Sequence, residues 1–139
     1  MNVRSFSLLA LLFAALHTPC LAEYFYNSSG SHVGRVETDS SGNARYYDKS
    51  GSFIGSSRKS GNTVRYYDKC GSFKGSAQIS GNTTRYYDKS GSYKGSANQS
   101  GSGTRYYDSR GSYAGSSQTS GSSTRYYDKS GSYKGSKRK

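Results

Sequence analysis

Residues 85–96 read RYYDKSGSYKGS, and this segment recurs through most of the chain. Four further copies, RYYDKSGSFIGS, RYYDKCGSFKGS, RYYDSRGSYAGS and RYYDKSGSYKGS, begin at Arg45, Arg65, Arg105 and Arg125. The five copies start 20 residues apart, and variable connectors containing Ser-Gly-Asn or Ser-Gly-Ser separate them. A fixed period of this length is typical of a repeat architecture, and each copy has the length of one β-hairpin.

The turns of these hairpins are marked by glycine, which recurs every 10 residues, as at Gly51, Gly61, Gly71 and Gly81. Asp-Lys-Ser-Gly is typical of a type I turn closed by a glycine bulge, because Asp accepts hydrogen bonds from nearby backbone and glycine adopts positive φ readily. Between the turns, Tyr, Thr, Phe and Val suit a pleated surface, and no segment shows helical periodicity. The repeats therefore predict an all-β protein.

The turn also predicts a strand register: Asp48 faces Ser52, Tyr47 faces Phe53, Tyr46 faces Ile54 and Arg45 faces Gly55. Because sides alternate along a strand, Tyr47 and Arg45 share one side and Tyr46 lies on the other. The second side repeats as an aromatic platform of five tyrosines: Tyr46, Tyr66, Tyr86, Tyr106 and Tyr126. Facing the platform we expect lysines in three repeats: Lys74, Lys94 and Lys134. We expect this side to face solvent, with Tyr–Lys contacts of ~0.5–1 kcal/mol.

Any core of this chain is expected to consist mainly of Tyr and Phe, because aliphatic residues are scarce after residue 22. A disordered Ser/Gly/Tyr-rich chain is the competing interpretation, but the regular phasing of strand and turn residues favours a folded array. A flat meander leaves two open edges, whereas a closed arrangement has none. We therefore expect an antiparallel meander of tandem 20-residue β-hairpin repeats, closed as a radial ring or a shallow barrel.

The recurrence Tyr-Asp-x-x-Gly-x-x-x-Gly, as in residues 47–55, resembles the repeats of bacterial β-flower proteins, including the four-fold β-flower domain. The resemblance extends over roughly residues 45–136. It implies a radially symmetric arrangement of short β-hairpins and no established enzymatic activity. The chain departs from the β-flower pattern by carrying Ser, Lys and Tyr where the petals usually have Val, Ile or Ala.

Residues 1–22 have the three parts of a secretory signal: Arg4, an apolar stretch over residues 8–16, and a polar end closing with Cys-Leu-Ala. The apolar stretch is too short to span a bilayer, which disfavours a membrane anchor. We therefore expect cleavage between Ala22 and Glu23, a secreted or periplasmic protein, and no transmembrane segment in the mature chain. Residues 23–44 are predicted to form a degenerate N-terminal capping hairpin, and residues 45–139 five tandem hairpins with a basic C-terminal tail.

The charge balance favours anionic partners. The sequence has 20 Lys and Arg against 8 Asp and Glu, a net charge of +12 at pH 7, and loss of Arg4 with the signal lowers it to +11. Anionic glycan, lipid headgroups and nucleic acid are all compatible with this surface. The candidate binding residues are Arg45, Arg65, Arg85, Arg105, Arg125, Lys74, Lys94 and Lys134. In the competing interpretation, the charges only solvate the surface, or the arginines pair with aspartates or tyrosine hydroxyls and hold the fold.

The chain beyond the signal offers little catalytic chemistry. Its one histidine, His32, cannot supply a catalytic set in every repeat, and the single aspartate per hairpin is expected to cap a turn. We expect no enzymatic activity, no metal site and no cofactor. Cys70 stands alone in that part of the chain and allows a homodimer through an intermolecular disulfide. We expect an exported binding module for anionic surfaces or polymers; the alternative is a structural or adhesive, self-associating Tyr-rich repeat protein.

Overall fold

The structure is a computed structural model that describes residues 21–139. The predicted signal lies outside this part, apart from Leu21 and Ala22, which belong to the first strand. The strands are β1 (Leu21–Asn27), β2 (His32–Thr38), β3 (Ala44–Asp48), β4 (Phe53–Ser60), β5 (Thr63–Asp68), β6 (Phe73–Ser80), β7 (Thr83–Asp88), β8 (Tyr93–Ser100), β9 (Gly103–Asp108), β10 (Tyr113–Ser120), β11 (Ser123–Asp128) and β12 (Tyr133–Arg138). Among these residues, no helix is long and apolar enough to cross a membrane.

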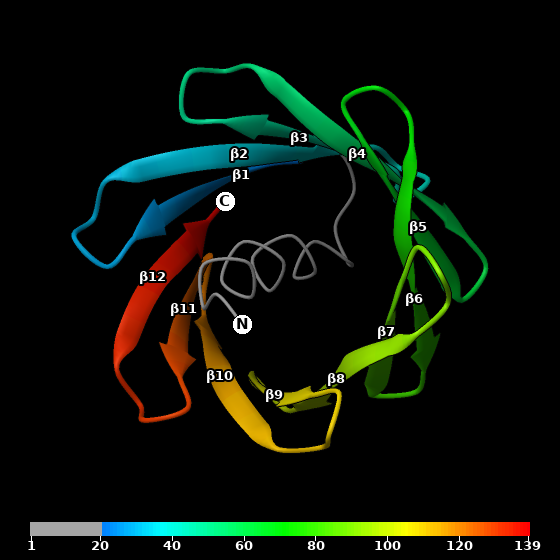
Figure 1. Cartoon of the computed structure of the whole chain (residues 1–139). Coiled ribbons are helices and arrows are strands. Elements are labelled where there is room, and N and C mark those ends of the chain that lie inside the picture. Colours follow the sequence, from blue (N-terminus) through cyan, green and yellow to red (C-terminus); the bar gives the residue numbers. More distant parts are fainter. Residues whose placement is uncertain (1–20) are drawn as a thin grey trace.

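Each strand pairs antiparallel with the next, and β1 also pairs with β12, so the meander closes into a barrel (Figure 1). The hairpins splay outward around a central axis, with the first and last hairpins side by side. The predicted all-β fold, the 20-residue hairpin unit and the closure are thereby confirmed.

The hairpin turns have the hydrogen bonds that the sequence predicts. In the fourth hairpin, Asp88 Oδ1 accepts hydrogen bonds from the backbone N–H groups of Ser90 and Ser92, both at 2.9 Å. Gly91 has φ of 83° and donates its N–H to the Asp88 carbonyl at 3.0 Å. In the first hairpin, Asn27 takes the place of the aspartate and accepts the equivalent two backbone bonds. A carbonyl-type oxygen at this position, and not a negative charge, is therefore what the turn needs.

Beyond the turn, a β-bulge shifts the register and corrects part of the prediction. Tyr47 faces Phe53 as expected, but Tyr46 then faces Gly55 and Arg45 faces Ser56. The predicted pairs Tyr46–Ile54 and Arg45–Gly55 are wrong, because the bulge inserts one extra residue into β4. The same shift occurs between β5 and β6, β7 and β8, β9 and β10, and β11 and β12.

Glycine is required where the bulged strand meets the next hairpin. A Cβ atom on Gly55 would lie 2.5 Å from the backbone oxygen of Tyr67 on β5. A carbon atom does not fit at that distance, so the two backbones can approach each other only because position 55 has no side chain. The equivalent glycines meet the next backbone in the same way: Gly34, Gly75, Gly95, Gly115 and Gly135.

The interior of the barrel is built around six aromatic residues at one level, one from each odd-numbered strand: Phe25, Tyr46, Tyr66, Tyr86, Tyr106 and Tyr126. Each faces a glycine of the following strand in the same register. Small residues fill the positions beside them, such as Ser57, Ala77, Ala97 and Ser117, all of which are buried. Large and small side chains alternate around the wall, and this alternation lets aromatic residues fill a narrow barrel.

The two strands that close the barrel, β1 and β12, pair in the same register as the strands that join neighbouring hairpins elsewhere, such as β4 and β5. Phe25 on β1 faces Lys137 on β12, as Tyr66 on β5 faces Ser57 on β4. The predicted basic tail is thus largely part of β12, and Lys137 is buried in the barrel. The hairpin predicted as a cap has a strand neighbour on both sides, because β1 contacts both β2 and β12. Closure therefore places the first hairpin within a continuous ring.

Candidate functional site

Five arginines lie at one level on the outer wall of the barrel, one on every second strand: Arg45, Arg65, Arg85, Arg105 and Arg125. All five side chains are exposed. Adjacent strands are ~4.8 Å apart, so successive arginines on alternate strands are spaced by roughly 10 Å around the barrel. We refer to these five residues as the arginine belt.

The belt arginines have mostly uncharged neighbours across the strands. The facing residues on the preceding strands are Glu37 for Arg45, Arg58 for Arg65, Gln78 for Arg85, Asn98 for Arg105 and Gln118 for Arg125. Within residues 21–139, no ion pair or side-chain hydrogen bond involves a belt arginine, and Glu37 pairs with Arg35 at 3.1 Å. The interpretation in which these arginines hold the fold through aspartates or tyrosine hydroxyls is therefore not supported.

The three candidate lysines lie at the bulges near the hairpin tips, away from the belt. Their ammonium groups approach the turn aspartates at 3.6, 3.2 and 3.0 Å: Lys74–Asp68, Lys94–Asp88 and Lys134–Asp128. Each lysine side chain is more than half exposed, so solvent screens these pairs. The predicted Tyr–Lys contacts are wrong, because each lysine is the extra residue of the bulge and lies beside the turn aspartate, while the tyrosine faces the next glycine.

The predicted aromatic platform is also wrong in its location. Tyr46 and Tyr126 are each only 6% exposed, and Tyr66, Tyr86 and Tyr106 are at least partly buried in the same interior layer. The hydroxyl of Tyr46 shares a hydrogen bond of 2.9 Å with Ser57 Oγ, as that of Tyr106 does with Ser117 Oγ. Burial raises the pKa of Tyr46 to about 12, against the smaller lowering effect of the Ser57 hydrogen bond. The platform tyrosines are therefore core residues.

A different set of aromatic residues is available on the outer wall. Tyr47 and Phe53 pack edge-to-face with ring centroids 6.1 Å apart, and each later repeat has the same pair at 6.0–6.3 Å. The second member of each pair is 38–42% exposed. The guanidinium of Arg58 lies 5.7 Å from the centre of the Tyr67 ring. The register prediction found these pairs, but it did not single them out as exposed surface.

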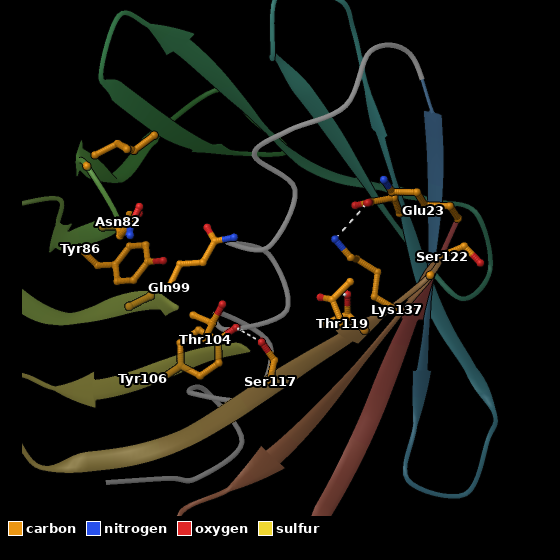
Figure 2. Close-up of a pocket in the computed structure, with 17 residues that line it drawn as sticks. Glu23, Asn82, Tyr86, Gln99, Thr104, Tyr106, Ser117, Thr119, Ser122 and Lys137 are labelled. Atoms are coloured by element: carbon orange, nitrogen blue, oxygen red, sulfur yellow. Dashed lines mark hydrogen bonds and ion pairs between the residues drawn. The ribbon is translucent and has the colours of Figure 1, made fainter. Parts of the chain in front are cut away.

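The interior also contains a polar site that the sequence did not predict. Glu23 on β1 and Lys137 on β12 form an ion pair with Oε1–Nζ of 3.0 Å, and both side chains are buried. They border a cavity of about 250 Å³ inside the barrel (Figure 2). The equivalent position is Val in the first hairpin and Ser or Ala in the next four, so the charged Lys137 departs from the repeat, and this departure was the signal available in the sequence.

The other residues considered for chemistry, Cys70 and His32, lie apart from the belt and from the cavity lining. Cys70 lies exposed in the turn between β5 and β6 as a free thiol, and its N–H donates to Asp68 Oδ1 at 3.0 Å. His32 packs beside the rings of Tyr24 and Tyr26. Within residues 21–139, no group of three or more His, Cys, Asp or Glu residues is arranged to hold a metal ion.

Comparisons with known proteins assign no identity to this chain. No protein-family model matches the sequence, and no curated protein matches it significantly. The closed hairpin barrel has the radial arrangement that the β-flower resemblance implied, but an architecture alone shows no family membership.

Proposed function

We propose that this protein is an exported, non-catalytic binding module that holds anionic polymers on its arginine belt. The supporting observation is the repetition of one exposed arginine per hairpin at one level of the wall, with no acid paired to it among residues 21–139. Guanidinium groups bind phosphate, sulfate and carboxylate in a bidentate manner. Several such contacts on one scaffold raise the overall affinity without a deep pocket.

The curvature of the wall favours a flexible polymer over a flat membrane. The belt follows the curved wall over five of the six hairpins, from β3 to β11, so a flat surface touches only some of the arginines at a time. A flexible anionic chain, such as a sulfated glycan or single-stranded nucleic acid, can follow the wall and contact several arginines. The outer aromatic pairs lie next to the belt along each strand and offer ring faces for sugars or bases.

The belt is not equally positive around the barrel. Arg65 faces Arg58 on β4, so two guanidinium groups meet there, whereas Arg45 faces Glu37. We infer that the wall at β4 and β5 is the strongest part of the belt and that the wall at β2 and β3 is the weakest. Arg65 and Arg45 therefore form a matched pair of test positions, because they hold equivalent places in the repeat and differ in the charge of the residue that faces them.

Binding to heparin and to single-stranded DNA at increasing salt tests this proposal. Arg65→Gln should weaken binding and lower the slope of log K against log salt by about 0.7 for single-stranded DNA, and Arg45→Gln should do so less. Melting temperatures should stay close to that of the unmodified protein, because exposed substitutions of this kind usually change stability by less than about 0.5 kcal/mol. The proposal is contradicted if the protein binds neither heparin nor single-stranded DNA at low salt. It is also contradicted if Arg65→Gln and Arg45→Gln weaken binding equally.

Export is part of the proposal, and the predicted cleavage position has a structural consequence. Ala22 and Glu23 lie within β1, so cleavage between them shortens that strand by two residues and makes Glu23 its first. Mass spectrometry of the protein recovered outside the cytoplasm should give Glu23 as the N-terminal residue. A cytoplasmic protein that retains Met1 contradicts export.

Self-association is the second candidate function, and the exposed aromatic pairs favour it. Phe53, Phe73, Tyr93, Tyr113 and Tyr133 form a repeating apolar edge near the hairpin tips. Closure of the barrel leaves no free strand edge, so association must proceed through these side chains. Sedimentation at low and high salt distinguishes the two functions, because aromatic association persists in salt whereas polyanion binding weakens.

A further inference from the structure

The cavity inside the barrel has an unusually polar wall. Figure 2 shows Tyr86 and Gln99 on one wall and the Glu23–Lys137 pair on the opposite wall. Hydroxyl and amide side chains make up most of the rest of the lining: Asn82, Thr84, Thr104, Ser117, Thr119, Ser122 and Thr124. Several of the lining residues, among them Asn82, Gln99 and Ser122, are solvent-exposed, so the cavity opens to solvent and a polar molecule can enter it.

Two buried polar atoms of the barrel lack a hydrogen-bond partner, and one of them, on Glu23, lines this cavity. Glu23 is 4% exposed, and its Oε1 accepts from Lys137, but its Oε2 accepts no hydrogen bond. The hydroxyl of Tyr126, on the strand next to β12, is also buried and unpartnered. Unsatisfied buried polar groups are costly, and a charged oxygen more than a neutral one, so such groups call for an occupant that forms hydrogen bonds.

The charges of the lining restrict the occupant to a neutral molecule. The ammonium groups of Lys137 and Lys139 repel a bound cation, whereas the unpartnered carboxylate oxygen of Glu23 repels a bound anion. A hydroxyl group both donates and accepts, so it can donate to Glu23 Oε2 and accept from the amide of Gln99 or Asn82. The volume of about 250 Å³ lies just below the ~300–1,000 Å³ of sites for drug-sized ligands.

We propose that the barrel interior is a binding site for a neutral polyhydroxylated ligand of one or two sugar rings, with Glu23 Oε2 as the acceptor that orients it. The lining hydroxyl and amide groups supply the other hydrogen bonds, and the rings of Tyr86 and Tyr106 supply flat apolar surface. This site is separate from the arginine belt, because the two lie on opposite faces of the same wall.

The test uses NMR titration with glucose and maltose as the neutral probes, and with glucosamine and gluconate as charged probes of similar size. The methyl group of Ile79 and the side-chain amide of Gln99 line the cavity and serve as reporters. We expect saturable shifts of both reporters with at least one neutral sugar and weaker binding of the two charged probes. Arg85→Gln, on the outer wall, should leave the sugar affinity unchanged.

The repeats provide substitutions that keep the fold. The double variant Glu23→Thr/Lys137→Ser gives the first and last strands the residues found at Thr104 and Ser117, and so removes the ion pair without leaving one charge buried. Gln99→Ile reproduces Ile79 at the equivalent position and leaves the ion pair intact. We expect both variants to melt cooperatively and to bind the sugar about tenfold more weakly or worse.

Two sets of results overturn this proposal. One is the absence of saturable shifts with either neutral sugar, which leaves water as the occupant of the cavity. The other is an unchanged sugar affinity in both folded variants, or tighter binding of glucosamine or gluconate than of glucose. Because Arg85→Gln tests the belt in the same protein, failure of the interior site is distinguishable from failure of polyanion binding.

Discussion

On the outer wall, the same arginine recurs in five hairpins. In the interior, the tyrosine position also recurs, but the position that faces it on the preceding strand varies from hairpin to hairpin. At that facing position the residues are Val36, Ser57, Ala77, Ala97, Ser117 and Lys137. Repetition on the outside produces a uniform charged belt. Variation on the inside breaks the symmetry of the barrel and places one ion pair and one cavity on particular strands.

Burial separates the ion pairs of the two regions. The Glu23–Lys137 pair is buried in the interior, whereas the Lys134–Asp128 pair lies in the solvent at a hairpin tip, although both have an N–O distance of 3.0 Å. Removal of one partner should therefore cost far more free energy of unfolding in the buried pair than in the exposed one. The charge that remains in the interior is shielded from water, which cannot solvate it. Substitutions in the interior should therefore change stability more than matched substitutions on the exposed surface.

Removal of one partner from the buried pair should have the largest effect. Lys137→Met leaves the Glu23 carboxylate unpaired in the interior, which should lower the free energy of unfolding by about 3–5 kcal/mol. Lys134→Met leaves Asp128 in solvent and should change stability little. Urea denaturation of the two variants gives the comparison, and equal midpoints contradict it.

Addition of a methyl group to an interior glycine should come next. Gly55→Ala places Cβ 2.5 Å from the Tyr67 oxygen, so the strands must separate, at a cost of about 1–3 kcal/mol or more. Gly91→Ala has open space around the new methyl group and only the strain of φ 83°, about 1 kcal/mol. Thermal melts should rank Gly55→Ala below Gly91→Ala, and the reverse order excludes the close approach of β4 and β5.

The interior tyrosines should make the barrel sensitive to alkali. Burial raises the pKa of Tyr46, Tyr66, Tyr86, Tyr106 and Tyr126. Since the folded state favours their neutral form, this stability is complete below about pH 10 and decreases as pH rises through the folded pKa, about 12 for Tyr46. An alkaline titration followed by tyrosinate absorbance should show these five of the 15 tyrosines ionising at higher pH than the exposed ones.

A matched variant sharpens the alkaline titration. Tyr46→Phe copies Phe25 at the equivalent position and should reduce the protected set by one tyrosine. The interior assignment is contradicted if all tyrosines ionise in one step while circular dichroism shows an intact fold, because the platform side chains would then be in contact with solvent.

The turn aspartates should give the smallest effect, at acidic pH. The hydrogen bond from the Ser90 hydroxyl, together with the Ser92 backbone N–H, lowers the pKa of Asp88. Its contribution is therefore present above the unfolded pKa and decreases as pH falls through the folded pKa. Asp88→Asn, which copies Asn27, should keep the turn and reduce the loss of melting temperature between neutral and acidic pH. An unchanged acid dependence contradicts a role for this carboxylate.

Local sequence determined the hairpins. The chemistry of Asp-Lys-Ser-Gly lies within a few residues, so the turn, the positive φ of its glycine and the first facing pair, Tyr47 with Phe53, followed directly from the repeat. The regular period of 20 residues predicted the architecture, and the absence of open edges favoured closure. The sequence placed the belt arginines correctly on the same side as Tyr47, but it assigned the solvent to the opposite side, so their exposure came only from the structure.

Only the tertiary structure decided which side of each strand faces inward and what the closed barrel encloses. The bulge lies on the even-numbered strands, so Tyr46 stays on the side opposite Tyr47, as predicted, but this side lines the interior and not the solvent. The glycine that faces Tyr46 also lies against the backbone of the next hairpin, a contact that a single repeat does not contain. The Glu23–Lys137 pair joins the two ends of the described chain, and it forms only because closure brings β1 beside β12.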